Sequence, residues 1–249
     1  MLHRRGTLSA DGDVRLAVSD RWGGVSAGGF GELNLAGHVG DEPSAVAENR
    51  QRLAAGLGLT RERVAFMSQV HGRDVAVVDR PVTGDAPVPE VDALVTRMPG
   101  LALAVLVADC VPVMLSSPAP DGTVLGVAHA GRRGVLSGVV AATVDAMRDL
   151  GARPEQTSAL VGPAVCGRCY EVPAAMADEL VALVPQARAT SRDGTPALDL
   201  PAAVAAQLRA AGVADVEVDG ACTAEDPGLY SYRRDAVTGR FAGLVWTDE

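Results

Sequence analysis

The chain has 249 residues, of which 48% are hydrophobic, enough for a substantial buried core. Its 22 basic and 31 acidic residues give a net charge of −9, which argues against nucleic-acid or anionic-membrane partners. No apolar run reaches the roughly 18 residues of a spanning helix, and no apolar segment of a secretion signal follows the basic start. We expect a cytoplasmic monomer or homodimer in which local arginines bind any anionic substrate.

Short runs with the pattern of β-strands are separated by Gly, Pro and Asp along the whole chain. They span residues 13–19, 62–70, 73–79, 91–96, 101–108, 111–116, 122–129, 157–162, 214–218 and 240–246. Helical patterns interrupt them at 43–57, 134–150, 173–184 and 200–211. Because the strands outnumber the helices without strict alternation, the sequence predicts an α+β fold with mixed sheets. No repeat or linker divides it, so we expect one domain over residues 1–249.

Helix ends are marked most clearly around the first and last helical patterns. Asp41 is placed to cap the first helix, Pro43 falls in its first turn, and Gly58 follows its end. Asp199 precedes the last helix as an N-cap. The segment 81–90, PVTGDAPVPE, is typical of a surface loop.

The stretch 101–115, LALAVLVADCVPVML, places an Asp and a Cys directly after a continuous apolar run. The run predicts a strand buried on both faces. Because an unpaired buried carboxylate is costly, Asp109 is expected to be paired, to bind a ligand or to lie at the rim of a cleft. A buried cysteine needs no function, so Cys110 taken alone is interpreted as a structural residue, and only the rest of the chain can change that interpretation.

Two of the four histidines stand in places like that of Cys110, since His71 and His129 each end a strand-like run before a small residue. Two imidazoles and one thiolate suit a catalytic zinc ion, with the fourth position left for water or substrate. The same ligands describe a blue-copper centre with Met67 or Met114 as axial ligand. Alternatively, Cys110 is a nucleophile and a histidine its base. The spacing does not separate these three readings.

Cys166 and Cys169 form a C-x-x-C pair in AVCGRCYEV. A zinc ribbon needs a second such pair, and the sequence contains none. We therefore take this pair as structural, with a redox-sensitive dithiol as the alternative.

Two of the arginine pairs in this acidic chain stand beside other motifs, Arg132-Arg133 after His129 and Arg233-Arg234 near the end. Guanidinium groups beside a Gly-rich turn suit bidentate binding of phosphate or carboxylate. The Gly-rich 21–35, RWGGVSAGGFGELNL, is expected to be a loop shaped around a ligand, although it lacks the usual nucleotide-phosphate motifs.

Six motifs together resemble one family over nearly the whole chain. They are GGVS…LNL…HVGD…NR at 23–50, SQVHG at 68–72, ADCVPV at 108–113, HAGRRG at 129–134, GPAVCGRCYEV at 162–172, and CT…YSYRRD…TGR at 222–240. In these the sequence resembles the laccase-domain family, once labelled polyphenol oxidases, now regarded as purine nucleoside phosphorylases, and in some bacteria called peptidoglycan editing factors.

The resemblance implies a four-layer α/β/β/α sandwich and a zinc site formed by His71, Cys110 and His129, with copper as the alternative metal. It implies phosphorolysis of adenosine, inosine, guanosine and methylthioadenosine, and deamination of adenosine. Asp109 is then expected to act beside the metal, as a supporting residue or as a proton carrier.

Substrate contacts are expected from Asn34, Arg50 and Arg233, which match pocket positions of the family, and from Arg133. The chain departs from the family in having Arg132 where a Trp is usual, which removes an aromatic surface near the metal. It also has Cys166, Gly167 and Arg168 at the centre of a variable motif.

Two other functions compete with nucleoside phosphorolysis. A copper-dependent polyphenol oxidoreductase is weakened because only His3 and His38 remain for further copper ligation. A hydrolase that edits peptidoglycan precursors is suggested by the name of the bacterial relatives, and the arginines would suit its anionic substrate.

Overall fold

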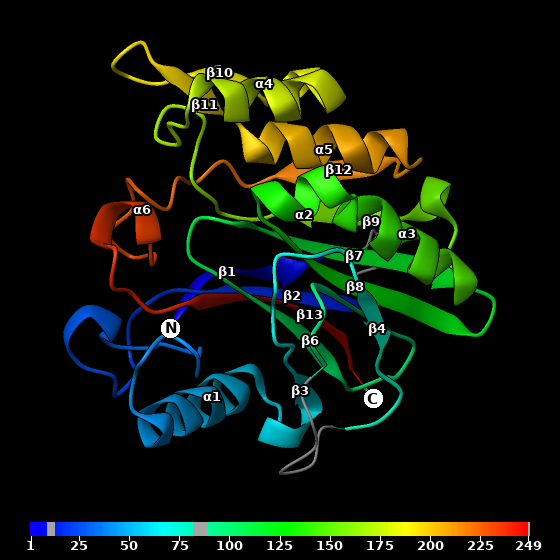
Figure 1. The fold of residues 1–249 in the computed structure, drawn as a ribbon. Coiled ribbons are helices and arrows are strands. Elements are labelled where there is room, and N and C mark those ends of the chain that lie inside the picture. Colours follow the sequence, from blue (N-terminus) through cyan, green and yellow to red (C-terminus); the bar gives the residue numbers. More distant parts are fainter. Residues whose placement is uncertain (9–12, 82–88, 249) are drawn as a thin grey trace.

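The computed structural model describes residues 1–8, 13–81 and 89–248, and most of its strands lie in two sheets (Figure 1). The five-stranded sheet has the order β1 (Leu2–Thr7), β2 (Val14–Ser19), β13 (Phe241–Thr247), β6 (Ala102–Val107) and β3 (Val64–Ala65). Only the pair of β3 and β6 in this sheet is parallel.

The six-stranded sheet has the order β12 (Asp215–Val218), β9 (Ser158–Val161), β7 (Val111–Ala119), β8 (Gly122–Ala130), β5 (Ala93–Thr96) and β4 (Val75–Val77). Its outer pairs are parallel and its inner pairs antiparallel. A separate hairpin joins β10 (Arg188–Thr190) and β11 (Pro196–Leu198). Mixed sheets confirm the predicted α+β class.

Helices cover the outer faces of both sheets. The α-helices are α1 (Pro43–Leu57), α2 (Arg132–Ser137), α3 (Val139–Asp149), α4 (Ala174–Leu183), α5 (Leu200–Ala210) and α6 (Tyr232–Asp235). In Figure 1, α1 lies under the five-stranded sheet, α2, α3 and α5 lie on the six-stranded sheet, and α4 lies beyond α5. The predicted four-layer α/β/β/α sandwich is therefore confirmed. Within the described residues, no helix is long and apolar enough to cross a membrane.

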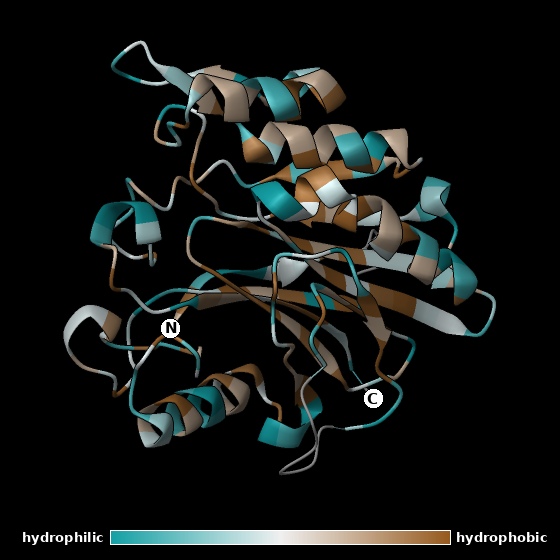
Figure 2. Ribbon diagram, in the orientation of Figure 1, coloured by the Kyte–Doolittle hydropathy of each residue, from teal (hydrophilic) through white to brown (hydrophobic). Residues whose placement is uncertain are grey.

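Three apolar cores hold these layers together, and the hydropathy colouring shows apolar residues along the inner strands (Figure 2). Strand β6 contributes to two of them. Its Leu103 and Val105 lie in the core between the sheets, whereas Ala104 and Leu106 pack in the core under α1. Because side chains alternate along a strand, this confirms the predicted strand buried on both faces.

Several predicted elements differ in the structure. The single helix predicted at 134–150 is two helices, α2 and α3, because Gly138 between them has a left-handed φ of 88°. Of the strand predicted at 62–70, only Val64–Ala65 forms, because Arg61–Arg63 is a short 3-10 helix and the chain becomes a loop beyond Ala65. Strand β1 was not predicted, because LHRRGT is too polar for an apolar pattern and forms an edge strand.

The helix ends follow the sequence only in part. Asp199 caps α5, since its side chain accepts a 2.9 Å hydrogen bond from the Ala202 amide. Gly58 ends α1 with a φ of 80°. The cap role predicted for Asp41 is wrong, because Glu42 occupies the N-cap position and Asp41 instead accepts bonds from other loop side chains. Most of the loop predicted at 81–90, residues 82–88, lies outside the described residues.

Candidate metal centre and its cavity

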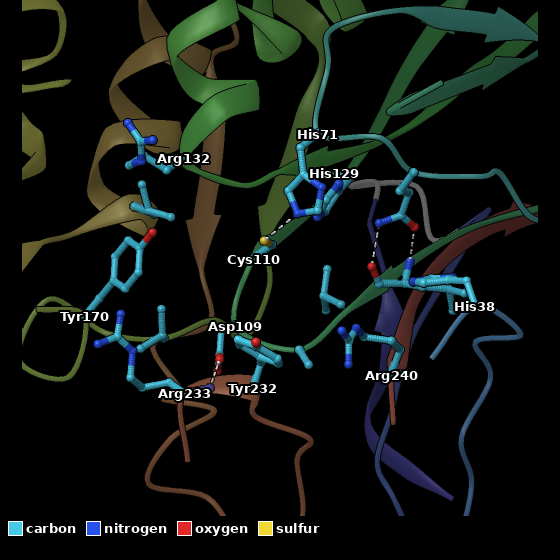
Figure 3. Close-up of a pocket in the computed structure, with 16 residues that line it drawn as sticks. His38, His71, Asp109, Cys110, His129, Arg132, Tyr170, Tyr232, Arg233 and Arg240 are labelled. Atoms are coloured by element: carbon cyan, nitrogen blue, oxygen red, sulfur yellow. Dashed lines mark hydrogen bonds between the residues drawn. The ribbon is translucent and has the colours of Figure 1, made fainter. Parts of the chain in front are cut away.

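Three potential metal ligands meet where the two sheets approach each other (Figure 3). Cys110 ends the short connection between β6 and β7, and His129 is the next-to-last residue of β8. His71 lies in the loop between β3 and β4, so the prediction that it ends a strand is wrong. The three residues nonetheless come together as predicted.

The donor atoms of His71, Cys110 and His129 all lie within 4.8 Å of one another. Cys110 Sγ is 4.0 Å from His71 Nε2, and the two imidazole rings cross at 74° with centroids 4.7 Å apart. His129 is buried, with 3% of its surface exposed, whereas His71 is exposed. The cluster is therefore anchored in the core on one side and open to solvent on the other.

Asp92, which the sequence did not single out, positions two of these residues. Its buried carboxylate accepts a 2.8 Å hydrogen bond at Oδ1 from His129 Nδ1. It also accepts bonds from the backbone amides of Val70, His71 and Gly72. Because Nδ1 is bonded to Asp92, Nε2 is the ring nitrogen of His129 that can bind a metal ion. A carboxylate orients many metal-bound histidines in this way.

Two non-glycine residues at the site adopt left-handed backbone conformations, which cost about 1–3 kcal/mol each. His71 has a φ of 60° and is held by the Asp92 carboxylate. Asp109 has a φ of 88°, and its carboxylate accepts bonds from Thr223 Oγ1, Ser231 Oγ and the Arg233 amide at 2.6–2.7 Å. Asp109 is thus paired at the rim of a cleft, as the sequence predicted.

Gly131 keeps space free beside the donors. A Cβ atom at this position would lie 2.8 Å from Cys110 Sγ and 3.2 Å from His71 Cδ2. The first glycine of HAGRRG, Gly131, is therefore required by the close packing of the cluster.

The donors influence each other's ionisation. Burial opposes ionisation of the Cys110 thiol, but the charge of His129 and hydrogen bonds from both histidines lower its pKa to about 6. Burial also disfavours the charged form of His129, yet Cys110 and Asp92 raise its pKa to about 9. Against burial, hydrogen bonds from His129 and from the Gly72 and His71 amides lower the pKa of Asp92.

Two imidazoles and a thiolate with a depressed pKa fit a transition-metal ion, and the side open to solvent leaves room for a fourth ligand. A blue-copper centre would add an axial methionine. Neither Met67 nor Met114 lines the cavity at this site, because both pack in the core between the sheets. Among the described residues, the donor set therefore matches an open zinc site better than a blue-copper site.

The donors lie in a cavity of about 330 Å³, a size typical of small-molecule sites. Figure 3 shows Arg132, Tyr170 and Arg233 on one side of the donors, and Arg240 and His38 on the other. The guanidinium carbon of Arg233 lies 5.2 Å from the centre of the Tyr170 ring. Arginines thus face a cavity in which Asp109, the one carboxylate among its described lining residues, already accepts three hydrogen bonds.

Not every predicted substrate contact lies in this cavity. Arg233 lines it, but Asn34, Arg50 and Arg133 do not. Asn34 is fully buried and bonds to the Ala36 backbone and to Asp41. Arg50 donates to the Leu35 carbonyl and stacks on Phe66, while Arg133 is exposed beside Arg132.

Other cavity residues escaped the sequence analysis. Arg240, His38, Tyr170 and Tyr232 all fall within the family motifs, but the sequence assigns none of them to the cavity. The position of Asp92 before the apolar run of β5, in VDALV, resembles that of Asp109 after β6 and was the available signal.

Comparison with known proteins places the chain among relatives of similar length. A family model described as multi-copper polyphenol oxidoreductase laccase matches residues 15–248. Purine nucleoside phosphorylase ORF3 of Streptomyces griseus is 53% identical over 248 residues, 100% of each chain. Purine nucleoside phosphorylase Rv2149c of Mycobacterium tuberculosis is 52% identical, and the match covers 94% of this chain and 92% of that protein.

Solved structures agree with these matches. YlmD from Geobacillus stearothermophilus superposes with a TM-score of 0.87 at 35% identity, covering 95% of this chain and 93% of that one. A Neisseria meningitidis protein of family DUF152 gives a TM-score of 0.86 at 34% identity, covering 99% of both chains. The chain therefore belongs to the family described as multi-copper polyphenol oxidoreductase laccase, several of whose members are named purine nucleoside phosphorylases.

Proposed function

We propose that this protein is a zinc-dependent purine nucleoside phosphorylase. It would convert adenosine, inosine or guanosine, together with phosphate, to the free base and ribose 1-phosphate, and methylthioadenosine to adenine and 5-methylthioribose 1-phosphate. It would also deaminate adenosine. The observation that carries the proposal is a His₂Cys donor set at the floor of a cavity faced by three arginines. The names of the relatives support the same reaction.

His71, Cys110 and His129 would hold the zinc ion, which would supply Lewis-acid polarisation of a substrate atom. Asp92 keeps His129 and the loop of His71 in place for this task. The whole chain carries a net charge of −9, which repels anions. The arginines of the cavity supply local positive charge that attracts them.

Arg132, Arg233 and Arg240 suit the phosphate, because a guanidinium group can donate two parallel hydrogen bonds to its oxygens. Arg132 is also paired with Glu179 at 3.0 Å, and Arg233 donates to the Glu171 carbonyl at 3.1 Å. These contacts fix the directions of both side chains before phosphate binds, which reduces the entropy lost on binding.

The nucleoside base would pack against Tyr170 and Tyr232, whose rings line the cavity. Desolvation, together with the charges of Arg240 and Arg50, lowers the pKa of His38, which favours its neutral imidazole. A neutral imidazole can accept a hydrogen bond from a purine or ribose group. Asp109 would act mainly through Arg233, whose backbone amide it binds, rather than as a proton carrier.

Incubation of the purified protein with each nucleoside and phosphate tests the proposal. We expect the free base from all four nucleosides, with 5-methylthioribose 1-phosphate from methylthioadenosine and ribose 1-phosphate from the other three. Inosine is expected from adenosine alone. Arg233→Ala should raise the KM for phosphate about tenfold, equivalent to about 1.4 kcal/mol. Arg148→Ala, on the exposed side of α3 and paired there with Asp145, is the matched control. Absence of product from every nucleoside would contradict the proposal.

Metal analysis separates this function from that of a copper oxidoreductase. We expect zinc to co-purify with the protein and to support product formation after it is added back to the metal-free chain. Copper bound in its place, with a visible thiolate-to-copper absorption band and oxidation of phenols, would favour the oxidoreductase instead.

A further inference from the structure

A second group of metal-capable side chains lies outside the cluster described above. The donor atoms of Cys166, Cys169, Cys222 and Glu225 all lie within 4.8 Å of one another. We propose that these four residues form a structural site for a thiophilic divalent cation of the zinc class. This inference is independent of the reaction that the protein catalyses.

Two turns of the same spacing supply the four residues. Cys166 and Cys169 form a C-x-x-C turn, in which the Cys169 amide donates to the Cys166 carbonyl at 2.9 Å. Cys222 and Glu225 form a C-x-x-E turn, in which the Glu225 amide donates to the Cys222 carbonyl at 3.0 Å. The second pair that a zinc ribbon requires is thus present, with a glutamate in place of its last cysteine.

The two turns face each other. The Cys166 amide donates to the Cys222 sulfur at 3.3 Å, and an isolated β-bridge between Ala164 and Cys222 aligns the two segments. The thiols of Cys169 and Cys166 point to the same oxygen of Glu225, at 3.2 and 3.8 Å. Four donors from two segments far apart in sequence therefore converge on one point.

This group differs from the first cluster in having four protein donors instead of three. A site with four protein donors and no place for substrate is the usual form of structural zinc. Cys222 is buried, Cys166 and Cys169 are half-buried, and Glu225 is exposed, so an ion can reach the donors from solvent.

The charges around the group suit a bound cation. Three thiolates and one carboxylate around a divalent ion would leave two negative charges. Arg192 forms an ion pair with Glu225 Oε1, and Arg168 Nη2 lies 3.9 Å from the same oxygen. The two guanidinium groups would offset that excess and orient the carboxylate.

A cation bound here would stabilise one wall of the cavity. Val165 and Tyr170, which line the cavity, directly flank the C-x-x-C turn. Thr223, inside the second turn, donates a 2.6 Å hydrogen bond to Asp109. The proposed site thus stabilises the positions of residues around the cavity without contacting a substrate.

The same C-x-x-C pair could instead form a disulfide, and metal binding in two variants of the full-length protein separates these outcomes. In protein purified under reducing conditions, we expect two tightly bound equivalents of zinc in the wild type and one in Cys110→Ala, in which binding at the first cluster is weakened and binding at the proposed site is not. After cobalt replaces zinc, the Cys110→Ala protein should show the intense thiolate-to-cobalt absorption of three sulfur ligands.

Glu225→Gln is the variant that preserves the fold, because the side chain is exposed. We expect at least tenfold weaker binding of one metal equivalent and unchanged binding of the other. Cys110→Ala protein without metal, or with metal but no thiolate absorption, would overturn the proposal. A Cys166–Cys169 disulfide found by mass spectrometry in the freshly purified wild type would overturn it as well.

Discussion

Asp92 and His129 are joined by a 2.8 Å hydrogen bond between the carboxylate Oδ1 and the imidazole Nδ1, in a position where Asp92 has no exposed surface. The same carboxylate accepts bonds from the amides of Val70, His71 and Gly72, the shortest of 2.6 Å from Gly72. One buried side chain therefore sets the orientation of two of the three proposed metal ligands.

Replacing this carboxylate tests its role. We expect Asp92→Asn to bind zinc about 10–100-fold more weakly, the usual effect of disturbing a residue behind a metal ligand. The amide NH₂ of Asn cannot accept the hydrogen bonds that the lost oxygen accepted, so the metal-free protein should also lose about 1–3 kcal/mol of stability. Zinc titration and denaturant unfolding measure the two effects. Unchanged zinc affinity would show that the carboxylate serves only the fold.

Variants of Cys110 distinguish a metal ligand from a nucleophile. As a ligand, Cys110→Ala should lose activity and bind zinc at this cluster at least about tenfold more weakly. Cys110→Asp and Cys110→His should keep part of both, since carboxylate and imidazole also bind zinc. Zinc content and nucleoside turnover are measured on the same preparations. An inactive Cys110→Ala that retains zinc at His71 and His129 would instead identify a nucleophile.

Gly131→Ala tests the space beside the donors. Its Cβ would lie 2.8 Å from Cys110 Sγ, so the sulfur or the chain must move, and we expect weaker zinc binding and lower turnover. Gly37→Ala is the matched control, because no atom lies within 4 Å of a Cβ there. Equal zinc affinity in the two variants would show that the cluster adapts to the methyl group.

Metal removal should expose a reactive thiol. In the metal-free protein the pKa of Cys110 is lowered to about 6, so the thiolate fraction, and the alkylation rate with it, should rise through pH 6 and level off above pH 7. An ordinary thiol would react mainly above about pH 8. Bound zinc should suppress this rapid phase, and Cys110→Ala should lack it. Rapid alkylation of the zinc-loaded protein at Cys110 would argue against ligation.

The parts of the fold that sequence predicts well are those where burial sets the pattern. Residues 101–108 are apolar without interruption because β6 packs against a core on each face. The strands predicted at 111–116 and 122–129 match β7 and β8 closely for the same reason, although their pairing as a hairpin was not predicted. Strand β1 was missed because an edge strand with exposed arginines needs no apolar pattern.

Those site residues could be predicted whose chemical type indicates their role. Residues whose role depends on the conformation of a loop could not. The residue types and strand-end positions of His71, Cys110 and His129 predict one shared site, and the family resemblance implies that they bind a metal. The structure brings their donor atoms together. The loop that carries His71 is held by hydrogen bonds to Asp92, twenty-one residues further along, and no local pattern encodes such a contact. The pairing of Cys166 and Cys169 with Cys222 and Glu225 was hidden because a glutamate breaks the expected cysteine spacing.

The donors of the first cluster also lie on the connections between the two sheets. His71 lies on the segment that passes from β3 in one sheet to β4 in the other, and Cys110 lies on the link from β6 to β7. An ion held there together with His129 would fix both connections to β8 of the six-stranded sheet. Cys110 directly precedes β7, and His71 is held by Asp92, which directly precedes β5. Because β5 and β7 both pair with β8, assembly of the six-stranded sheet brings the three donors together, and a bound ion would in turn favour these strand pairings.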